Sequence, residues 1–298
     1  MIHVNNFTNG ALNPLLAYVL SAMGCFLGLR CTTRARAYQG AARARWLTAG
    51  ALAIGSTGIW VMHFIAMLGF SIPDQSIRYN VPITILSMVI AVVVVGIGTF
   101  IVGFRDGTGP LLLGGVIIGL GVASMHYLGM SAIRVQDSLS YNPLLVAASV
   151  IIAVIAGTAA LWAALRLDTL WSTVVASLIM GVAVSGMHYT GMAALRVYPA
   201  PGLTVSTSAT ASALAFLLPL ILGLSMIGFI FSTVIALSPT AAEILEDGAL
   251  MARIAQPPRA GRSRPGVRAA RSGRAWPSAR RPRGFPPPWG KGRSRSRR

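Results

Sequence analysis

The chain has 298 residues, of which 54% are hydrophobic and only 11% are charged, whereas soluble domains carry about 25% charged residues. Fifteen of the 25 Lys and Arg lie between Arg253 and Arg298, so the net charge of +18 belongs mostly to the C-terminal end. This composition excludes an ordinary soluble globular domain and is typical of an integral membrane protein.

Seven apolar segments are each long enough to cross a bilayer, which takes about 20 residues. None contains Asp, Glu, Lys or Arg. Helices are expected because the backbone polar groups of a segment in lipid must bond within that segment. The segments are approximately Ala11–Leu29, Trp46–Phe70, Val81–Phe104, Pro110–Ile133, Pro143–Leu165, Leu170–Leu195 and Ala213–Leu237. The sequence therefore predicts an all-α integral membrane fold with seven transmembrane helices, occupying residues 11–237.

Arginines are distributed unevenly between the two sides of this predicted bundle. The loops on one side carry seven, which are Arg30, Arg34, Arg36, Arg43, Arg45, Arg105 and Arg166. The loops on the other side carry three, Arg78, Arg134 and Arg196. Because positively charged loops stay in the cytoplasm, we expect a plasma-membrane protein with residues 1–10 outside the cell and the C-terminus inside. Tyr79, Tyr141 and Tyr198 then fit an aromatic belt at the outer interface.

An internal repeat organises the first six segments. Its copies open at Asn13-Pro14, Asn80-Val81-Pro82 and Asn142-Pro143, where Asn is expected to cap a helix and Pro to occupy its first turn. Each copy returns outward through a Met-His motif: Met62-His63-Phe64-Ile65-Ala66-Met67, Met125-His126-Tyr127-Leu128-Gly129-Met130 and Met187-His188-Tyr189-Thr190-Gly191-Met192. Because each copy contains two helices, the three copies have the same orientation in the membrane. They can therefore be related by a pseudo-threefold axis along the membrane normal. The seventh helix then closes the bundle.

The motif histidines His63, His126 and His188 are the only imidazoles in the seven segments. Each lies about eight residues, or roughly 12 Å, below the outer end of its helix. Ionisable groups at membrane depth usually face the bundle interior, so we expect the three rings to converge. Methionines flank every histidine, at the preceding position (Met62, Met125, Met187) and four residues later on the same face (Met67, Met130, Met192). Imidazole and thioether without carboxylate favour copper, particularly Cu(I).

Structural roles compete with this interpretation. A single intramembrane His often bonds between helices, and a single Met usually packs; three copies at matched depth favour a shared polar or metal site. Arg134 and Arg196 follow their histidines by eight residues on the same face and are expected to snorkel to the outer interface. Cys25 and Cys31 are expected to be structural thiols without a disulfide. Five glycines near the motifs are expected to permit close helix contact; they are Gly121, Gly129, Gly181, Gly186 and Gly191.

The three motif copies, ending in the literal Met187-His188-Tyr189-Thr190, resemble the MHYT domain family of bacterial integral membrane sensors over about residues 11–201. The resemblance implies one or two copper ions and the sensing of oxygen, carbon monoxide or nitric oxide. It assigns the metal to Met62, His63, Met125, His126, Met187 and His188. Met67, Met130, Met192 and His3 are further candidate ligands, the last because a free N-terminus with His at position three can chelate Cu(II) outside the membrane.

Three functions remain open: a copper-dependent gas sensor, a copper transporter, and a haem-binding protein with His or Met as axial ligands. The absence of acidic residues in the segments argues against a proton relay. Many relatives continue into cyclic-di-nucleotide or kinase output domains. Nothing in this chain resembles a catalytic module, so we expect no enzymatic activity and a signal passed to an unknown cytoplasmic partner.

Residues 238–298 differ in character from the rest of the chain. From about Gly248 they are rich in Pro, Gly, Ser and Arg and have almost no aliphatic side chains, so we expect a disordered basic tail. Such a tail either binds anionic lipid at the inner leaflet or is dispensable. Charge alone is weak support for nucleic-acid binding, which is not expected because no nucleic-acid-binding motif accompanies it.

Overall fold

The computed structural model describes residues 4–73, 75–199, 210–237 and 249–251. The chain divides into two units, 1–247 and 248–298; in the second, residues 249–251 are helical. The helices of the first unit are α1 (Leu12–Arg36), α2 (Gly40–Leu52), the π-helix η1 (Ala53–Val61), α3 (Met62–Met67), α4 (Val81–Phe104), α5 (Thr108–Ser131), α6 (Pro143–Arg166), α7 (Leu170–Ala194), the π-helix η2 (Ala213–Leu217) and α8 (Leu218–Leu237). The fold is therefore mostly helical, as the sequence predicts.

Six helices among the described residues are long and apolar enough to cross a membrane. One of them is the continuous run Gly40–Met67, formed by α2, η1 and α3. The seventh predicted segment corresponds to η2 and α8, where Ala215–Phe231 forms a shorter apolar helix. The chain is thus a multi-pass membrane protein with at least six candidate crossings, and the seventh crossing stays a prediction.

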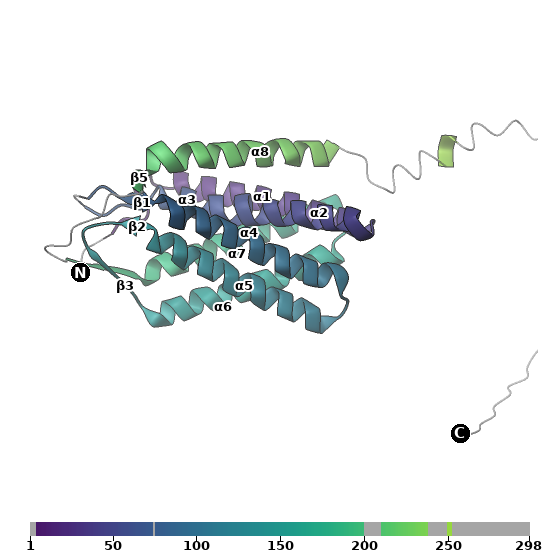
Figure 1. Ribbon diagram of the computed structural model, residues 1–298, viewed down its shortest axis with the longest axis horizontal. Helices are drawn as coiled ribbons and strands as arrows, with labels where there is room; N and C mark the ends of the chain where they lie inside the picture. Colours follow the sequence, from purple (N-terminus) through teal and green to yellow (C-terminus); the bar gives the residue numbers. More distant parts are fainter. Residues whose placement is uncertain (1–3, 74, 200–209, 238–248, 252–298) are drawn as a thin grey trace, which may run out of the picture. The chain divides into compact units, whose positions relative to one another are not determined.

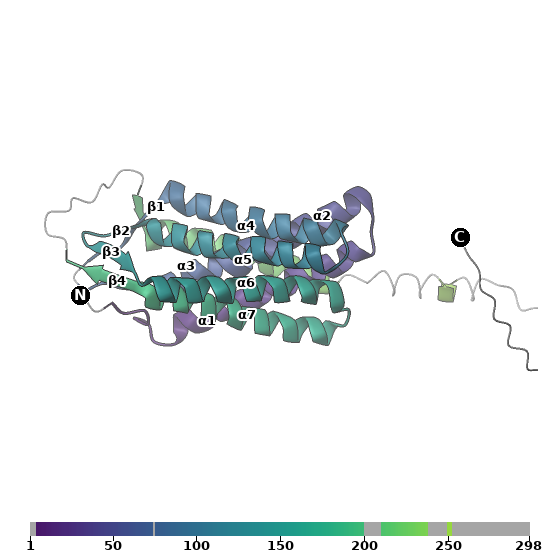
Figure 2. The same cartoon turned by 90° about the horizontal axis from the view of Figure 1, so that it is seen from below.

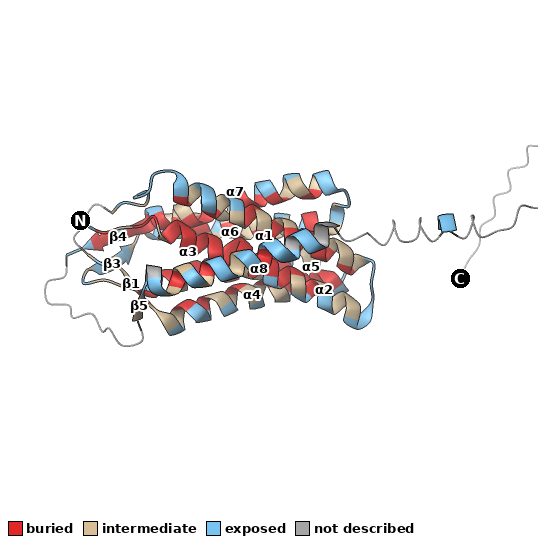
Figure 3. Cartoon of the chain, turned by 90° about the horizontal axis from the view of Figure 1, so that it is seen from above, coloured by how far each residue is buried: buried red, intermediate tan, exposed pale blue. Residues whose placement is uncertain are grey.

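The helices of the three copies form a closed ring. α1 packs against α7 on one side and η1 on the other, η1 packs against α4, and the contacts continue through α5 and α6 back to α7. Figure 2 shows α4, α5, α6 and α7 side by side in this order. α8 lies outside the ring against α1 and η1, as Figure 1 shows for α1. Figure 3 shows α3 as a largely buried segment, so the first Met-His motif lies inside the bundle.

Five short strands lie at one end of the helices (Figure 1); they are β1 (Arg78–Asn80), β2 (Ile133–Arg134), β3 (Ser138–Tyr141), β4 (Leu195–Tyr198) and β5 (Thr210–Ser212). In the second and third copies the strand before the first helix pairs antiparallel with the strand after the second helix, as β1 with β2 and β3 with β4. An isolated antiparallel bridge between Asn5 and Ser71 replaces this pairing in the first copy. β5 pairs with the other edge of β1. We call this end the strand-capped end.

Three details of the sequence prediction are wrong. Asn80 and Asn142 do cap α4 and α6, accepting hydrogen bonds from backbone N–H groups. Asn13 instead lies inside α1 and donates from Nδ2 to the carbonyl of Ile65 at 2.9 Å. Helix α1 also continues to Arg36 instead of ending at Leu29, and α2 begins at Gly40 instead of Trp46. The physical reason is that apolarity marks only the part of a helix within lipid, and both helices extend beyond that part. At the C-terminus of α1, Arg34 and Arg36 lie in the last turn, where basic residues stabilise a helix.

The third error concerns Arg134 and Arg196. Both were predicted to continue the helix faces of their histidines, but α5 ends at Ser131 and α7 at Ala194. Arg134 lies in β2 and Arg196 in β4. Both arginines therefore belong to the strand-capped end and point according to strand geometry, which alternates from one face to the other.

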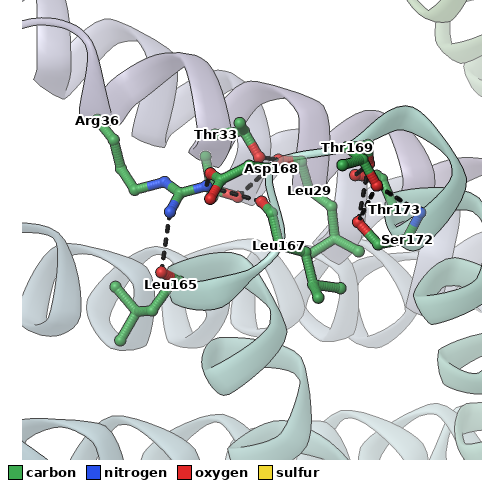
Figure 4. A network of polar contacts seen from close by, with 10 residues as sticks. Leu29, Thr33, Arg36, Leu165, Leu167, Asp168, Thr169, Ser172 and Thr173 are labelled. Carbon is green, nitrogen blue, oxygen red and sulfur yellow. Dashed lines mark hydrogen bonds and ion pairs between the residues drawn. The ribbon is translucent and has the colours of Figure 1, made fainter.

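At the opposite end, Arg36 connects α1 to the turn between α6 and α7 (Figure 4). Its guanidinium donates to the carbonyls of Leu165 at 2.8 Å and Leu167 at 2.7 Å, and to Asp168 Oδ1 at 2.5 Å. The carbonyls at a helix C-terminus lack partners within the helix, so Arg36 satisfies groups that would otherwise be unpaired. We call this end, with the α1–α2 turn, the arginine-rich end.

Replacing Arg36 by Ala is expected to lower the free energy of unfolding by about 1.5–3 kcal/mol, the usual value of hydrogen bonds from a charged donor. Asp168→Ala should cost less than about 1 kcal/mol, because the Asp168 side chain is 74% exposed and exposed ion pairs contribute little. Equilibrium unfolding in mixed micelles measures both. Equal losses for the two variants would contradict the role assigned to the carbonyl bonds.

Candidate metal centre

The three motif histidines meet inside the bundle. Helices α3, α5 and α7 carry His63, His126 and His188, and all three side chains are buried. Nδ1 of His63 lies 3.0 Å from Nδ1 of His188 and 3.2 Å from Nδ1 of His126. The ring centroids are 5.0–5.2 Å apart and each pair of rings is nearly perpendicular. The predicted convergence of the rings is confirmed, and the three form a buried group that can hold a metal ion.

Hydrogen bonding alone satisfies this arrangement poorly. A neutral imidazole offers either one proton or one lone pair at Nδ1, yet Nδ1 of His63 has two Nδ1 neighbours at hydrogen-bonding distance. It can therefore make only one well-formed bond. A metal ion resolves the conflict because it accepts a lone pair from every ring. Three imidazole nitrogens bound about 2.0–2.1 Å from one ion stand roughly 3.3–3.6 Å apart, so the two short Nδ1 separations at His63 need to open by only a few tenths of an ångström. One ligand atom from each of the three rings already lies within 4.8 Å of the others.

The outer edges of two histidine rings face glycines of the neighbouring copy. A Cβ placed on Gly129 would lie 2.6 Å from Nε2 of His63, and one on Gly191 would clash with Nε2 of His126. Both Nε2 atoms are buried, and neither has a hydrogen-bond partner among the described residues. Each glycine stands three residues after a motif histidine, and Ala66 holds that position in the first copy. The glycines therefore admit the rings, in addition to the predicted contact between helices.

Ring placement should depend on these glycines. We expect Gly191→Ala and Gly129→Ala each to weaken copper binding by about 10–100-fold, the loss typical when support for a metal ligand is removed. Gly186→Ala is the matched control, because a Cβ there meets nothing within 4 Å. Competitive titration of purified protein with a chromogenic Cu(I) chelator measures the affinities. Unchanged affinity in both glycine variants would contradict the inferred packing.

Six methionines belong to the three Met-His motifs. All are buried: Met62, Met67, Met125, Met130, Met187 and Met192. Their burial agrees with the sequence pattern, and their role as ligands stays a prediction. His3, the remaining candidate, lies outside the described residues.

One pocket reaches this region from the strand-capped end. It has a volume of about 360 Å³ and is lined by residues that include Asn9, Asn13, Met67 and Tyr79. Met67 is one of the candidate thioether ligands, on the same helix as His63. The last residue of the first Met-His motif therefore forms part of the pocket wall. Nothing in the sequence pattern indicated it.

An aromatic collar covers the histidines. The residue after each histidine packs edge-on against that histidine's ring, at centroid distances of 4.7–5.0 Å. Each of these three residues also contacts an aromatic ring near the strand-capped end, in the pairs Phe64–Tyr79, Tyr127–Tyr141 and Tyr189–Phe7. Tyr127 also shares a 2.7 Å hydrogen bond with Ser149. The collar repeats around the threefold arrangement and separates the histidines from the strands.

The collar corrects the predicted aromatic belt. Tyr79 is buried and Tyr141 is partly buried, whereas Tyr198 is exposed. Burial raises the pKa of Tyr79 above its usual range. Burial, with a contribution from nearby Tyr127, raises the pKa of Tyr141 to about 12. Both phenols therefore stay neutral at physiological pH, and neither places a negative charge over the site. A position in an interfacial belt needs only an amphipathic side chain at the right depth. The sequence therefore cannot distinguish a tyrosine of the belt from a tyrosine that packs inside the bundle.

Comparison with known proteins gives three matches to one family model. The model is MHYT, described as "Bacterial signalling protein N terminal repeat", and it matches residues 57–115, 119–177 and 181–244. The matched segments begin 62 residues apart, and each contains one Met-His motif. Together they cover more than half of the chain.

Several curated proteins are similar over the same region. The bifunctional diguanylate cyclase/cyclic di-GMP phosphodiesterase MucR of Pseudomonas aeruginosa is 38% identical over 184 residues, which cover 60% of this chain and 27% of that protein. The cyclic di-GMP phosphodiesterase NbdA of the same organism is 41% identical over 176 residues, 57% of this chain and 22% of that protein. An uncharacterized signaling protein of Caulobacter vibrioides is 36% identical over 191 residues, 64% of this chain and 23% of that protein.

The chain therefore spans about a quarter of the length of these relatives. No solved structure matches it.

Proposed function

The chain belongs to the MHYT family of bacterial signalling-protein repeats, and we propose that it is a membrane sensor domain in which His63, His126 and His188 bind copper. The observation that carries the proposal is the convergence of three buried imidazoles: Nδ1 of His63 lies within 3.2 Å of Nδ1 in both His126 and His188. One lone-pair acceptor can satisfy the three rings together. Membership of a signalling family and relatives named as cyclic di-GMP enzymes support a role in signalling.

The surrounding donors favour copper over harder metals. Neutral imidazoles and the thioethers of Met62, Met125 and Met187 are soft or intermediate ligands, and soft ligands select Cu(I). The described acidic residues are Asp106, Asp137 and Asp168, all of which lie between helices, so no carboxylate competes within the bundle. Met67, Met130 and Met192 are further candidate ligands one turn closer to the strand-capped end.

Bound copper would supply a centre able to bind oxygen, carbon monoxide or nitric oxide. The chain's own residues prepare the surroundings for such a ligand. The aromatic collar and the buried methionines exclude water from the histidines, and the pocket at Met67 provides an approach from the strand-capped end. A small uncharged gas crosses this apolar region at little cost, whereas a charged solute does not.

Haem is the weaker alternative cofactor. The histidine rings are in contact, with centroids 5.0–5.2 Å apart, and a porphyrin cannot enter between rings at that separation.

Copper transport is the second functional alternative, favoured by the line of soft donors from Met67 to the histidines. Copper uptake into vesicles would distinguish transport from sensing.

The signalling route follows from the membrane arrangement. We place the strand-capped end outside the cell and the arginine-rich end in the cytoplasm, because arginines concentrate in cytoplasmic loops. α8 serves as the seventh crossing and closes a membrane domain of residues 11–237, so that residues 238–298 follow it on the cytoplasmic side.

The cyclic di-GMP chemistry named for the relatives belongs, in this proposal, to regions outside the quarter that this chain matches. The sensor domain itself is not an enzyme and acts through a cytoplasmic partner.

Metal content and optical spectra test the proposal. Protein purified from copper-supplemented cells should carry copper and show a spectral change when the reduced form is exposed to carbon monoxide. The variant with His63, His126 and His188 all replaced by Ala should lose both signals. Wild-type protein without copper under reducing and oxidising conditions would refute the proposal, and a porphyrin spectrum would establish haem instead.

A further inference from the structure

A small cavity lies inside the bundle, among side chains of α1, η1, α5, α6 and α7. Its volume is about 30 Å³, and it shares no lining residue with the pocket at Met67. None of the residues that line it is charged or carries a hydroxyl group. The Cys25 thiol is the only side-chain hydrogen-bond donor among them, and a thiol is a weak donor. The cavity is therefore an apolar space between helices.

This cavity lies one helical turn from the three histidines, on the side of the arginine-rich end. Ile59, Val122 and Val184 all line it, and each stands four residues before a motif histidine. Along an α-helix such as α5 or α7, residues four apart share a face and are separated by about 6 Å of rise. Met187, which directly precedes His188, also lines the cavity. All three copies of the repeat therefore contribute to one space that adjoins the candidate metal centre.

The size and the lining of the cavity restrict what can occupy it. A buried water needs about two to four polar partners, and cavities that stay empty of water are apolar. A volume of about 30 Å³ holds about one molecule of the size of water, and a diatomic gas is only slightly larger. An uncharged gas has no hydrogen bonds to lose, so it avoids the cost that a polar or charged solute would incur. The cavity therefore suits a diatomic gas better than water, an ion or a larger organic ligand.

We propose that this cavity is a docking site that holds one molecule of the sensed gas, oxygen, carbon monoxide or nitric oxide, beside the copper centre. The inference rests on the proposed function, because it places the gas on the arginine-rich side of that centre. The aromatic collar covers the histidines toward the strand-capped end, whereas the cavity leaves space on the other side. The Met187 side chain belongs to the cavity wall beside His188, and its unbranched chain can change rotamer to let a small molecule pass. A gas molecule that leaves the centre thus stays within about one helical turn of it and can return.

Flash photolysis of the full chain, loaded with copper, reduced and saturated with carbon monoxide, tests the proposal. Light releases the carbon monoxide, and molecules held inside the protein rebind before those that reach the solvent. We expect the wild type to show two rebinding phases that do not depend on the gas concentration, the slower one from the cavity. Infrared spectra recorded after photolysis at low temperature should show a narrow band from docked gas, separate from the band of gas dissolved in lipid.

Variants that fill or enlarge the cavity locate the docked molecule. Ala156→Val on α6 and Ala183→Val on α7 each add two methyl groups to the lining, so each should lose the slower phase and the infrared band. Ile118→Val removes one methyl group from the same lining and should keep the slower phase and lengthen it. Ala159→Val is the matched control and should behave as the wild type, because Ala159 is exposed on the helix of Ala156 and does not line the cavity. Copper content and circular dichroism check that each variant keeps its metal centre and its helices.

The outcomes separate this inference from the proposed function. A wild type that forms no complex with carbon monoxide would overturn both. A complex whose slower phase and infrared band are unchanged in both filling variants would overturn the docking site alone and leave the copper centre in place. Loss of the two signals in Ala159→Val to the same extent as in Ala156→Val would also overturn it, since the effect would then not depend on the cavity.

Discussion

Replacing His63 by Ala is expected to weaken copper binding by more than about 100-fold. His63 is the central residue of the cluster, since its Nδ1 lies within 3.2 Å of Nδ1 in both His126 and His188. Losing a residue that merely supports a metal ligand typically costs 10–100-fold in affinity, and losing a ligand should cost more. Titration of reduced protein against a competing Cu(I) chelator gives the dissociation constants.

The control for this variant is His3→Ala, which removes a histidine outside the membrane segments and should leave the buried site unchanged. A Cu(I) affinity that falls with His3→Ala and not with His63→Ala would move the metal to the N-terminus. His126→Ala and His188→Ala should each resemble His63→Ala, because each leaves only two rings. A single histidine variant with wild-type affinity would show that its ring is not a ligand.

Replacing Met62, Met125 and Met187 together by Leu is expected to weaken Cu(I) binding roughly 10–100-fold, the range for loss of supporting interactions at a metal site. Leu keeps nearly the same volume, and such exchanges usually cost less than about 1.5 kcal/mol of stability each. Zn(II) affinity should change far less, because imidazole binds zinc well without thioethers. The ratio of the two affinities therefore isolates the contribution of sulfur.

The matched comparison uses Met67, Met130 and Met192, each one turn beyond its histidine. If the first set supplies the thioether ligands, the triple Leu variant of the second set retains most of its Cu(I) affinity. A stronger loss in the second set would reassign the ligands to the i+4 positions. Equal Cu(I) affinity in both triple variants and the wild type would show that the imidazoles bind copper without any methionine ligand.

The sequence predicts the arrangement of the site better than its details. Apolar length sets the helices, and a repeat with two helices per copy makes the copies parallel. Three histidines at one depth then converge, because an imidazole facing lipid is costly. Those inferences rest on distances along a helix, which are regular, and the contacts among His63, His126 and His188 confirm the convergence.

Features that depend on contacts between distant segments, or on hydrogen-bond register within a helix, could not be predicted from the sequence pattern. The strands at the strand-capped end pair residues more than 50 positions apart, such as Arg78 with Arg134, and each is too short to carry a pattern of its own. The π-helix η1 differs from the helices around it in its hydrogen-bond register, and it lies inside a continuous apolar run whose sequence does not mark that change. The place of Gly191 against the His126 ring became visible only once the neighbouring copy was positioned.

The same limit explains the error at Asn13. Its sequence context matches those of Asn80 and Asn142, which cap helices. The N-terminal segment of the first copy instead continues into α1 ahead of Asn13, and its amide bonds to the carbonyl of Ile65. Local sequence cannot distinguish a capping Asn from one that bonds across to another helix, because both positions satisfy the side chain.

The central claim is that His63, His126 and His188 together bind one copper ion. Copper K-edge X-ray absorption of the reduced, purified protein tests it most directly. We predict about one copper per chain, with imidazole nitrogens at about 2.0–2.1 Å and sulfur at about 2.3 Å, taking the zinc distances as a guide. Replacing the three histidines should remove the imidazole scattering. Copper bound without any imidazole in its coordination sphere, or bound equally by the triple-histidine variant, would contradict the account.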